Sequence, residues 1–173
     1  MSGERLANEI GIRHATDADL PFILAIANKP IAESPYIWAE TPKTLDERRA
    51  WFEAHRTGNL PVLVATHGDE VVGWSSLSVF RAASGYRFTS EVSVYVDDRF
   101  HGCGVGTQLV AAIESEARAR SLHALLAVID AEHEASIRLF TRFGFAEVGR
   151  FPEVGRKFDQ WRGEVFLLKL LGS

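Results

Sequence analysis

The sequence predicts one α/β domain built around a mixed, mostly antiparallel sheet of six to seven strands with about four flanking helices. Three observations support this prediction. The chain has 173 residues and is 46% apolar, which suits one globular domain. Segments with the two-residue period of strands alternate with segments that have the helical period. A glycine-rich turn joins a strand to an amphipathic helix in the second half of the chain.

Two helices with a long irregular segment between them are predicted in the first third of the chain. Thr16 is suited to cap the first helix, which we expect to end near Asn28. Residues 29–42 contain three prolines and no steady period, so they are predicted to form a long loop, and such loops are often functional. Thr44 and Glu47 match a capping box, which predicts that the second helix begins there.

The pattern of apolar residues predicts strands over 12–15, 61–66, 71–80, 89–96, 124–130, 145–150 and 165–171. The strands between residues 61 and 96 are expected to form an antiparallel meander. In the last of these three strands, alternation places Glu91, Ser93 and Tyr95 on one face and the valines on the other. An amphipathic helix after Gly106 and a short helix over 133–142 complete the predicted order.

Glycines at positions 102, 104 and 106 form the connection between the strand over 89–96 and the next helix. Glycines let a ligand approach the backbone closely, and the free N–H groups of a helix start favour an anion such as phosphate. The connection therefore predicts an anion site, with an ordinary glycine-rich turn as the alternative. Two known phosphate loops are excluded, because Thr107 stands where a dinucleotide fingerprint needs glycine and the Gly-Lys-Ser/Thr ending of a P-loop is absent.

Charge and composition argue against several functions. The net charge is −4 and the basic residues are dispersed, so we expect no nucleic-acid partner and interpret Arg48 and Arg49 as a solvated helix face. The histidines lack metal-ligand spacing, so no metal is expected. The chain has no membrane-spanning run, no secretory signal and one cysteine, Cys103, which predicts a cytoplasmic protein without a membrane partner. We expect residues 1–11 to form a flexible extension and residues 12–173 to form the domain.

Four motifs occur in order along the chain: Glu91–Val96, His101–Gly106, Ala135–Leu139 followed by Gly144 and Phe145, and Glu153–Phe158. Together they resemble the GNAT family of N-acetyltransferases, and within it the phosphinothricin and methionine sulfoximine acetyltransferases. Trp38 and Arg81 also match that subgroup, and the resemblance covers residues 12–171. It implies the three-layer GNAT fold, in which the strands over 89–96 and 124–130 splay apart, and it implies a homodimer.

The resemblance implies acetyl-CoA as the cosubstrate. Its pantetheine arm would pair with the backbone of Val94 and Val96, on either side of Tyr95. Its pyrophosphate would lie on the amides of Gly102, Cys103, Gly104, Val105, Gly106 and Thr107. His133 stands where the subgroup has an asparagine that contacts CoA, and it can still donate one hydrogen bond. Backbone groups bind an anion without a positive net charge, so the net charge of −4 is no objection.

Glu91 is the expected base, which would accept the proton of the acceptor ammonium directly or through a water. The alternative is a structural carboxylate paired with an arginine. Phe140 stands where the family has a tyrosine or histidine as general acid, and it cannot transfer a proton. A thiol with a pKa near about 8.5 is a tolerable leaving group, so this loss is not decisive, and Tyr95 is another candidate donor. Acetylation through Cys103 is rejected, because no His or Asp lies at a diagnostic spacing.

Arg81 is predicted to clamp a substrate carboxylate, because a guanidinium binds a carboxylate with two hydrogen bonds. Trp38, Val92 and Ser93 are predicted to complete the acceptor site. We therefore expect acetylation of a small amino-acid-like amine, as a detoxification reaction. Two alternatives stay open: acetylation of another amine, such as a polyamine, an aminoglycoside or a peptide N-terminus, and a CoA-binding module without turnover.

Overall fold

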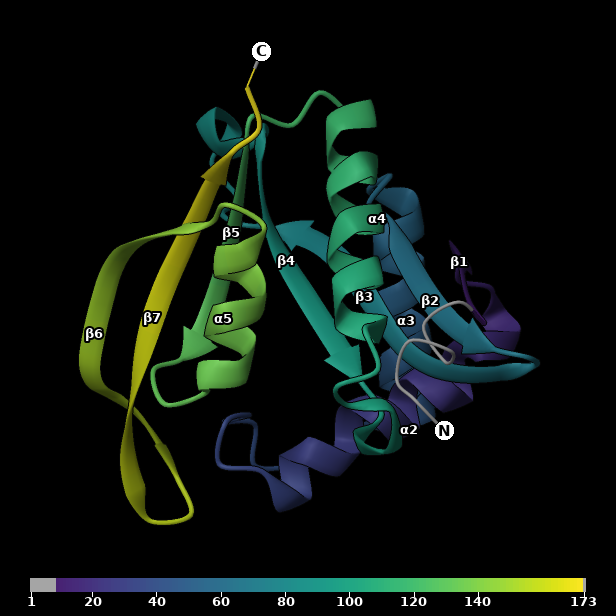
Figure 1. Cartoon of the computed structure of the whole chain (residues 1–173), viewed down its shortest axis with the longest axis horizontal. Coiled ribbons are helices and arrows are strands. Elements are labelled where there is room, and N and C mark those ends of the chain that lie inside the picture. Colours follow the sequence, from purple (N-terminus) through teal and green to yellow (C-terminus); the bar gives the residue numbers. More distant parts are fainter. Residues whose placement is uncertain (1–8, 173) are drawn as a thin grey trace.

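A seven-stranded sheet with the order β1-β2-β3-β4-β5-β7-β6 forms the centre of the molecule, seen in a computed structural model that describes residues 9–172 (Figure 1). Its strands are β1 (Ile10–His14), β2 (Val62–His67), β3 (Glu70–Val79), β4 (Thr89–Val96), β5 (Ala124–Asp130), β6 (Ala146–Lys157) and β7 (Gln160–Leu170). Every neighbouring pair is antiparallel except β4 and β5, which are parallel. This confirms the predicted mixed, mostly antiparallel sheet.

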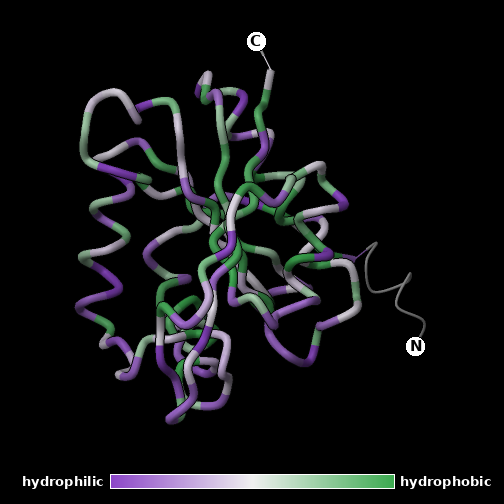
Figure 2. Tube along the Cα trace, turned by 90° about the vertical axis from the view of Figure 1, so that its left-hand side faces the viewer, coloured by the Kyte–Doolittle hydropathy of each residue, from purple (hydrophilic) through white to green (hydrophobic). Residues whose placement is uncertain are grey.

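Helices cover both faces of the sheet. The α2 helix (Leu20–Glu33) and the α3 helix (Leu45–Thr57) pack on one face, mainly against β2 and β3. The α4 helix (Val105–Ala119) and the α5 helix (Glu134–Arg142) pack on the other, in front of the sheet in Figure 1. Figure 2 shows the hydrophobic stretches concentrated in the strands between the helices. None of the helices within residues 9–172 has the length and apolarity that a membrane crossing requires.

The capping box at the start of α3 is present as predicted. The Thr44 side chain accepts a hydrogen bond from the Glu47 backbone N–H at 3.2 Å, and the Glu47 carboxylate accepts one from the Thr44 N–H at 2.8 Å. These bonds satisfy backbone donors that a helix start leaves free. The start of α3 is therefore well defined, which fixes the position of Arg48 one turn further on.

Two predicted boundaries at the N-terminal end were wrong. The α2 helix continues past Asn28 to Glu33. Pro30 lies in the last turn of this helix, and the Pro30 carbonyl accepts a hydrogen bond from the Ser34 N–H at 3.0 Å. The predicted extension over 1–11 also overlaps the sheet, since Ile10 and Gly11 belong to β1 and pair with β2. Residues 1–8 of that extension lie outside the described part of the chain.

The hairpin of β6 and β7 is longer than the predicted strands over 145–150 and 165–171. It extends to a turn at Phe158 and Asp159, with register shifts between Glu147 and Gly149 and between Phe151 and Gly155. Most residues of β6 are exposed, so the sequence has no buried face to produce an alternating pattern there. The added length brings this hairpin to the loop that follows α2.

The pairing of β4 with β5 ends early. Only residues Thr89–Glu91 of β4 pair with β5, at residues 124–126. Beyond this point β4 stays paired with β3 as far as Val96, while β5 stays paired with β7 as far as Asp130. The two central strands therefore diverge, as Figure 1 shows, and the edge of β4 from Val92 to Val96 has no strand beside it.

Candidate active site

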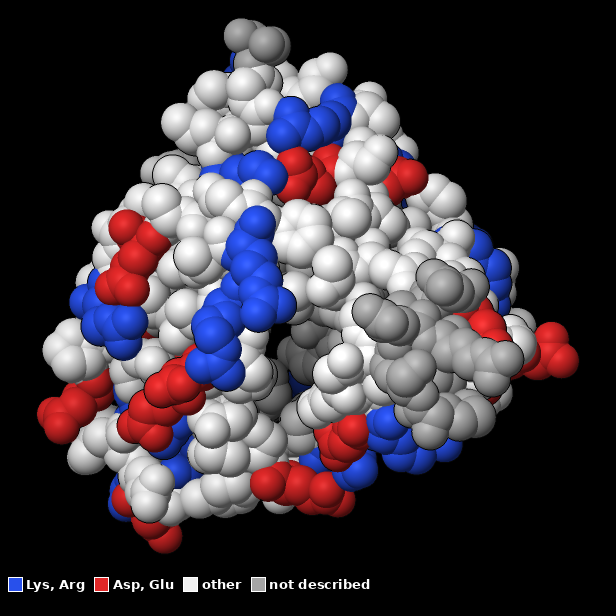
Figure 3. All heavy atoms as spheres, viewed as in Figure 1, with Lys and Arg blue, Asp and Glu red and all other residues white. Residues whose placement is uncertain are grey.

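A cavity of about 870 Å³ lies between the diverging strands. Its walls come from the ends of β4 and β5, from α2 and from the start of α5, with the lining residues including Val94, Val128, His133 and Phe140. Figure 3 shows this face of the molecule hollowed between α4 and α5, with basic side chains over the α5 side. The volume falls in the range of pockets that hold small ligands and cofactors.

The free edge of β4 presents backbone hydrogen-bonding groups to this cavity. The Asp97 N–H donates to the Val72 carbonyl on β3 at 2.9 Å. Successive residues of a strand direct their backbone groups to opposite edges, so residues 92, 94 and 96 direct theirs away from β3. Val94 and Val96 are two of these residues. The imidazole Nε2 of His101 lies 3.0 Å from the Val96 carbonyl, which occupies that acceptor. The amide and carbonyl of Val94 stay available to an extended, amide-containing ligand.

The glycine connection forms the predicted helix start. Gly102 and Gly104 have φ angles of 76° and 81°, in the left-handed region that favours glycine, and α4 begins directly afterwards at Val105. No residue within 9–172 accepts a hydrogen bond from the amides of residues 104–107. Four free amides at the positive end of a helix dipole are suited to bind an anion. Cys103 is half-buried beside them, with its Sγ 3.7 Å from the His101 carbonyl.

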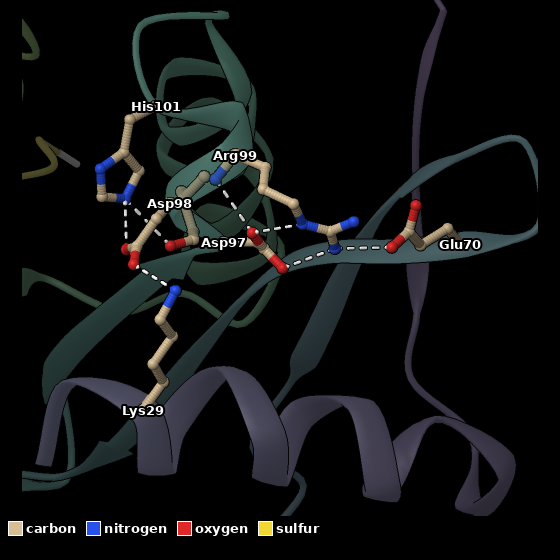
Figure 4. Close-up of polar contacts among 7 residues, drawn as sticks. Lys29, Glu70, Asp97, Asp98, Arg99 and His101 are labelled. Carbon is tan, nitrogen blue, oxygen red and sulfur yellow. Dashed lines mark hydrogen bonds and ion pairs between the residues drawn. The ribbon is translucent and has the colours of Figure 1, made fainter. Parts of the chain in front are cut away.

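Ion pairs hold this connection beside α2 (Figure 4). The Lys29 Nζ on α2 lies 2.7 Å from an oxygen of Asp98, and His101 approaches the other oxygen of the same carboxylate at 3.6 Å. Arg99 turns back onto Asp97 through two hydrogen bonds to its carboxylate at 2.8 and 3.0 Å. These contacts orient the chain between β4 and the glycines, at the rim of the cavity.

The opposite rim is formed by His133 and Phe140. The imidazole of His133 stacks on Tyr36 with the ring centres 4.3 Å apart, and its burial lowers the pKa, which favours the neutral ring. Phe140 is buried and packs edge-on against Phe145. The cavity therefore has an apolar wall where the resemblance implies a tyrosine or histidine.

Glu91, Ser93 and Tyr95 share the face of β4 that is opposite to α4, as predicted. Glu91 is half-buried, and its carboxylate forms no hydrogen bond or ion pair with any residue in the described part of the chain. Burial raises the pKa of Glu91, and the nearby charge of Glu164 raises it further. An unpaired carboxylate with a raised pKa is suited to accept a proton.

Val92 does not lie on that face. Its side chain is buried in the core between the sheet and α4 and α5, and Val92 is one of the residues that line the larger cavity. The alternation that turns Glu91 toward one face turns Val92 toward the other, as predicted, and a contact of Val92 with the acceptor stays a prediction.

A second cavity of about 410 Å³ lies on the Glu91 face, between the sheet and α3. Residues Ile37, Ser93 and Tyr95 line both cavities, so the two meet there. Tyr95 stacks on Trp74 with the ring centres 4.5 Å apart, and burial raises the pKa of its phenol. The Glu91 side chain lines neither cavity, but its strand partner Ser78 and its neighbour Ser93 do.

The loop after α2 is tied to the β6–β7 hairpin and to the end of β5. The Trp38 indole N–H donates to the Asp130 carboxylate at 2.9 Å, and Arg162 of β7 donates to both oxygens of that carboxylate at 2.7 and 2.8 Å. The Lys157 Nζ donates to the carbonyls of Ile31 and Ala39 at 2.7 and 2.5 Å. Trp38 was predicted to contact the acceptor, but it lines neither cavity and binds Asp130 instead. The sequence did not indicate the roles of Asp130 and Arg162, although the buried-type run over 124–130 ends in that aspartate.

Arg81 is not brought to the cavities. It is exposed in the turn after β3, with its guanidinium carbon 5.1 Å from the Phe80 ring centre and 5.6 Å from the Tyr86 ring centre, and it lines neither cavity. Within residues 9–172 no three His, Cys, Asp or Glu side chains are grouped so that they could hold a metal ion.

Comparison with known proteins agrees with this geometry. Residues 25–145 match the model of the acetyltransferase (GNAT) family. The L-methionine sulfoximine/L-methionine sulfone acetyltransferase of Pseudomonas paraeruginosa is 44% identical over 157 residues, which cover 90% of this chain and 91% of that protein. The phosphinothricin N-acetyltransferase of Streptomyces coelicolor is 35% identical, covering 88% and 91%. The crystal structure of a phosphinothricin acetyltransferase from Sinorhizobium meliloti in complex with acetyl-CoA has a TM-score of 0.91 at 28% identity, covering 95% of this chain and 89% of that chain.

The close packing of Trp38 against Gly155 leads to a first prediction. A Cβ atom at Gly155 would lie 2.2 Å from the Trp38 ring, so Gly155→Ala must displace that ring. We expect the free energy of unfolding, measured in urea, to fall by about 1–3 kcal/mol, the usual range for overpacking. Gly149→Ala on the same strand is the control, because no atom lies within 4 Å of its added Cβ. Equal effects of the two substitutions would contradict this packing of Trp38 against Gly155.

Proposed function

This chain belongs to the acetyltransferase (GNAT) family and is an acetyl-CoA-dependent N-acetyltransferase, and we propose that its acceptor is the amine of a small amino acid of the methionine sulfoximine or phosphinothricin type. One observation carries the proposal. The edge of β4 that separates from β5 has free backbone groups and a helix N-terminus on one side and the unpaired Glu91 carboxylate on the other. The acyl donor would therefore bind along the edge of β4 and the amine beside Glu91, so that the two meet at this strand.

The residues present fit acetyl-CoA, which supplies the acetyl group as a reactive thioester. The backbone of Val94 would pair with the pantetheine amides, and the Val96 carbonyl would do so after His101 turns aside. The free amides at the start of α4 would hold the pyrophosphate. His133 lines the same cavity and can donate one hydrogen bond. None of these contacts needs a basic side chain.

Glu91 would accept the proton that the acceptor ammonium must lose before it attacks. Its raised pKa brings the carboxylate closer to the pH at which the protein works, which favours this transfer. Phe140 offers no proton to the departing thiolate. A thiol pKa near about 8.5 means that the thiolate leaves without an acid, and the Tyr95 phenol, which lines the same cavity, is a candidate donor.

We also propose a cytoplasmic homodimer that detoxifies its acceptor. Exposed apolar side chains on the β6–β7 hairpin, among them Val154, Phe158 and Trp161, offer a surface for a second copy. Sedimentation equilibrium tests this assembly, and a monomer at micromolar concentration would contradict it.

An acceptor panel tests the proposed function. Release of the CoA thiol is measured with L-methionine sulfoximine, L-methionine sulfone and phosphinothricin, and with spermidine, an aminoglycoside and an alanine-terminated peptide. We expect turnover of one or more of the amino acids at a kcat/KM at least about tenfold above that of the other amines. The reason is that the cavity on the Glu91 face is small, about 410 Å³, and suits a small acceptor. Turnover confined to the other amines would overturn the acceptor, and acetyl-CoA binding without any turnover would indicate a binding module.

Glu91→Gln tests the base. We expect kcat/KM to fall by about 100-fold at pH 7 while the affinity for acetyl-CoA is unchanged, because only proton transfer is lost. The deficit should shrink as the pH rises, since more of the amine is then neutral. An unchanged rate would mean that Glu91 is structural.

The acid limb of the wild-type pH profile gives a second readout on the same residue. Activity should fall as the pH drops through the raised pKa of Glu91, where the carboxylate becomes protonated. Glu164→Gln removes the nearby like charge, so this limb should move to lower pH. A limb that stays in place would separate Glu91 from the proton transfer.

Gly104→Val tests the helix start. Gly104 has a φ angle of 81°, which a β-branched residue adopts only with strain of about 1–3 kcal/mol, so the amides should leave their positions. We expect calorimetry to show acetyl-CoA affinity lowered about tenfold or more. Gly85→Val is the control, because its added Cβ meets no atom within 4 Å. Equal affinities would remove the glycine connection from the cofactor site.

A further inference from the structure

A buried arginine without a polar partner lies on the acceptor side of the sheet. Arg48, in the first turn of α3, is 9% exposed, and its guanidinium forms no hydrogen bond or ion pair with any residue in 9–172. Its Nε is fully buried and unsatisfied. Its neighbour Arg49 is exposed and paired with Asp46. The expectation that both arginines form a solvated face is therefore wrong for Arg48.

Aromatic rings contact the guanidinium but leave its N–H groups free. Its central carbon lies 4.5 Å from the ring centre of Trp51 and 5.5 Å from that of Trp74. Cation–π attraction of this kind is modest, whereas burying an unpaired ion is costly. An arginine has five in-plane donors, which ring faces do not satisfy as a carboxylate does. The site is therefore built for a ligand that accepts hydrogen bonds and carries negative charge.

The cavity in front of Arg48 has the other features of an anion subsite. It is the cavity of about 410 Å³, and its polar lining residues include Ser76, Ser78, Ser93 and Lys43. The Ser78 hydroxyl lies 3.3 Å from the His55 Nε2. One carboxylate, Glu47, also lines it, but this side chain already accepts from the Thr44 amide and from Lys43. The Arg48 guanidinium is the charge in this lining that lacks a counter-ion.

The position of this cavity relates Arg48 to the proposed base. The cavity meets the cofactor cavity at Ser93 and Tyr95, and its Ser78 is the strand partner of Glu91. The phenol of Tyr95 is close enough to both Arg48 and Glu91 for each charge to affect its pKa. A free cation and a free carboxylate thus flank one short stretch of β4. That is the charge pattern complementary to a small zwitterion.

We propose that Arg48 binds the carboxylate of the amino acid acceptor, so that α3 and β3 hold the acid end while the amine is directed toward Glu91. This inference rests on the proposed function and names the acceptor class further: small amino acids with a free carboxylate. It differs from the sequence prediction, which placed the clamp at Arg81. An exposed arginine outside the cavities is in high dielectric, where an ion pair contributes little.

The test compares Arg48→Met with Arg48→Lys, and uses Arg49→Met as the matched exposed control on the same helix. Acceptors are the best amino acid of the panel and its carboxamide. We expect Arg48→Met to raise KM for the amino acid about 30-fold or more, with the carboxamide affected less than about threefold. Arg48→Lys should recover part of the loss, because an ammonium lacks the planar two-point fork. Acetyl-CoA affinity, measured by calorimetry, should be unchanged in all three variants, which shows that they are folded.

Other results would overturn the proposal. Equal losses for the amino acid and its carboxamide would assign Arg48 a structural role, and a selective loss in Arg81→Ala alone would return the clamp to Arg81. Calorimetric titration of the amino acid into the CoA-loaded enzyme gives a readout without turnover. An amino acid that is acetylated by the wild type but is unaffected by Arg48→Met refutes only this inference, whereas a wild type that neither binds nor acetylates amino acids refutes the proposed acceptor as well.

Discussion

The divergence of β4 from β5 after Glu91 is the constraint on which the site depends. Three residues of parallel pairing join the two strands, and beyond them each strand follows its other neighbour. A sheet that stayed closed would use the backbone groups of Val94 internally and would leave no space between β4 and α5. Because the strands separate, the same backbone becomes a binding edge beside the α4 N-terminus. Main-chain groups can bind an anion without basic side chains, so the net charge of −4 is compatible with the proposed cofactor site.

The second requirement is a fixed position for the loop that follows α2. Asp130, at the end of β5 where the strands are farthest from pairing, binds Arg162 and also accepts the Trp38 indole N–H. Lys157, at the turn end of β6, donates to the carbonyl of Ile31 in the last turn of α2 and to that of Ala39 in this loop. Replacing a buried ion pair such as Asp130–Arg162 by apolar residues is often neutral for stability. We therefore interpret this pair as holding the loop in position. It fixes one wall of the cavities to the opposite end of the sheet.

Much of this arrangement could be predicted from the sequence, because it depends on local patterns. The capping box at Thr44, the helix start after Gly104 and the facing of Glu91 each follow from residues within a few positions of one another. The rest depends on contacts between distant segments. Lys157 reaches a residue 126 positions away, and Arg48 stands in a charged run that is typical of a solvated helix. One step along a helix turns a side chain by about 100°, which is why Arg48 is buried and Arg49 is not.

Two ionisable side chains of opposite sign, Glu91 and Arg48, lie on the side of the sheet that α3 covers, and neither forms an ion pair among the described residues. Each is costly to bury alone: burial raises the pKa of Glu91 and lowers that of Arg48, in both cases by opposing the charged form. A direct ion pair would remove both penalties, but the described residues show none between them, and the charges of both groups act on the Tyr95 phenol. A molecule with an ammonium at one end and a carboxylate at the other satisfies both groups at once. If the acceptor binds as we propose, it would relieve an electrostatic cost that the protein retains, and an uncharged analogue would relieve only part of it.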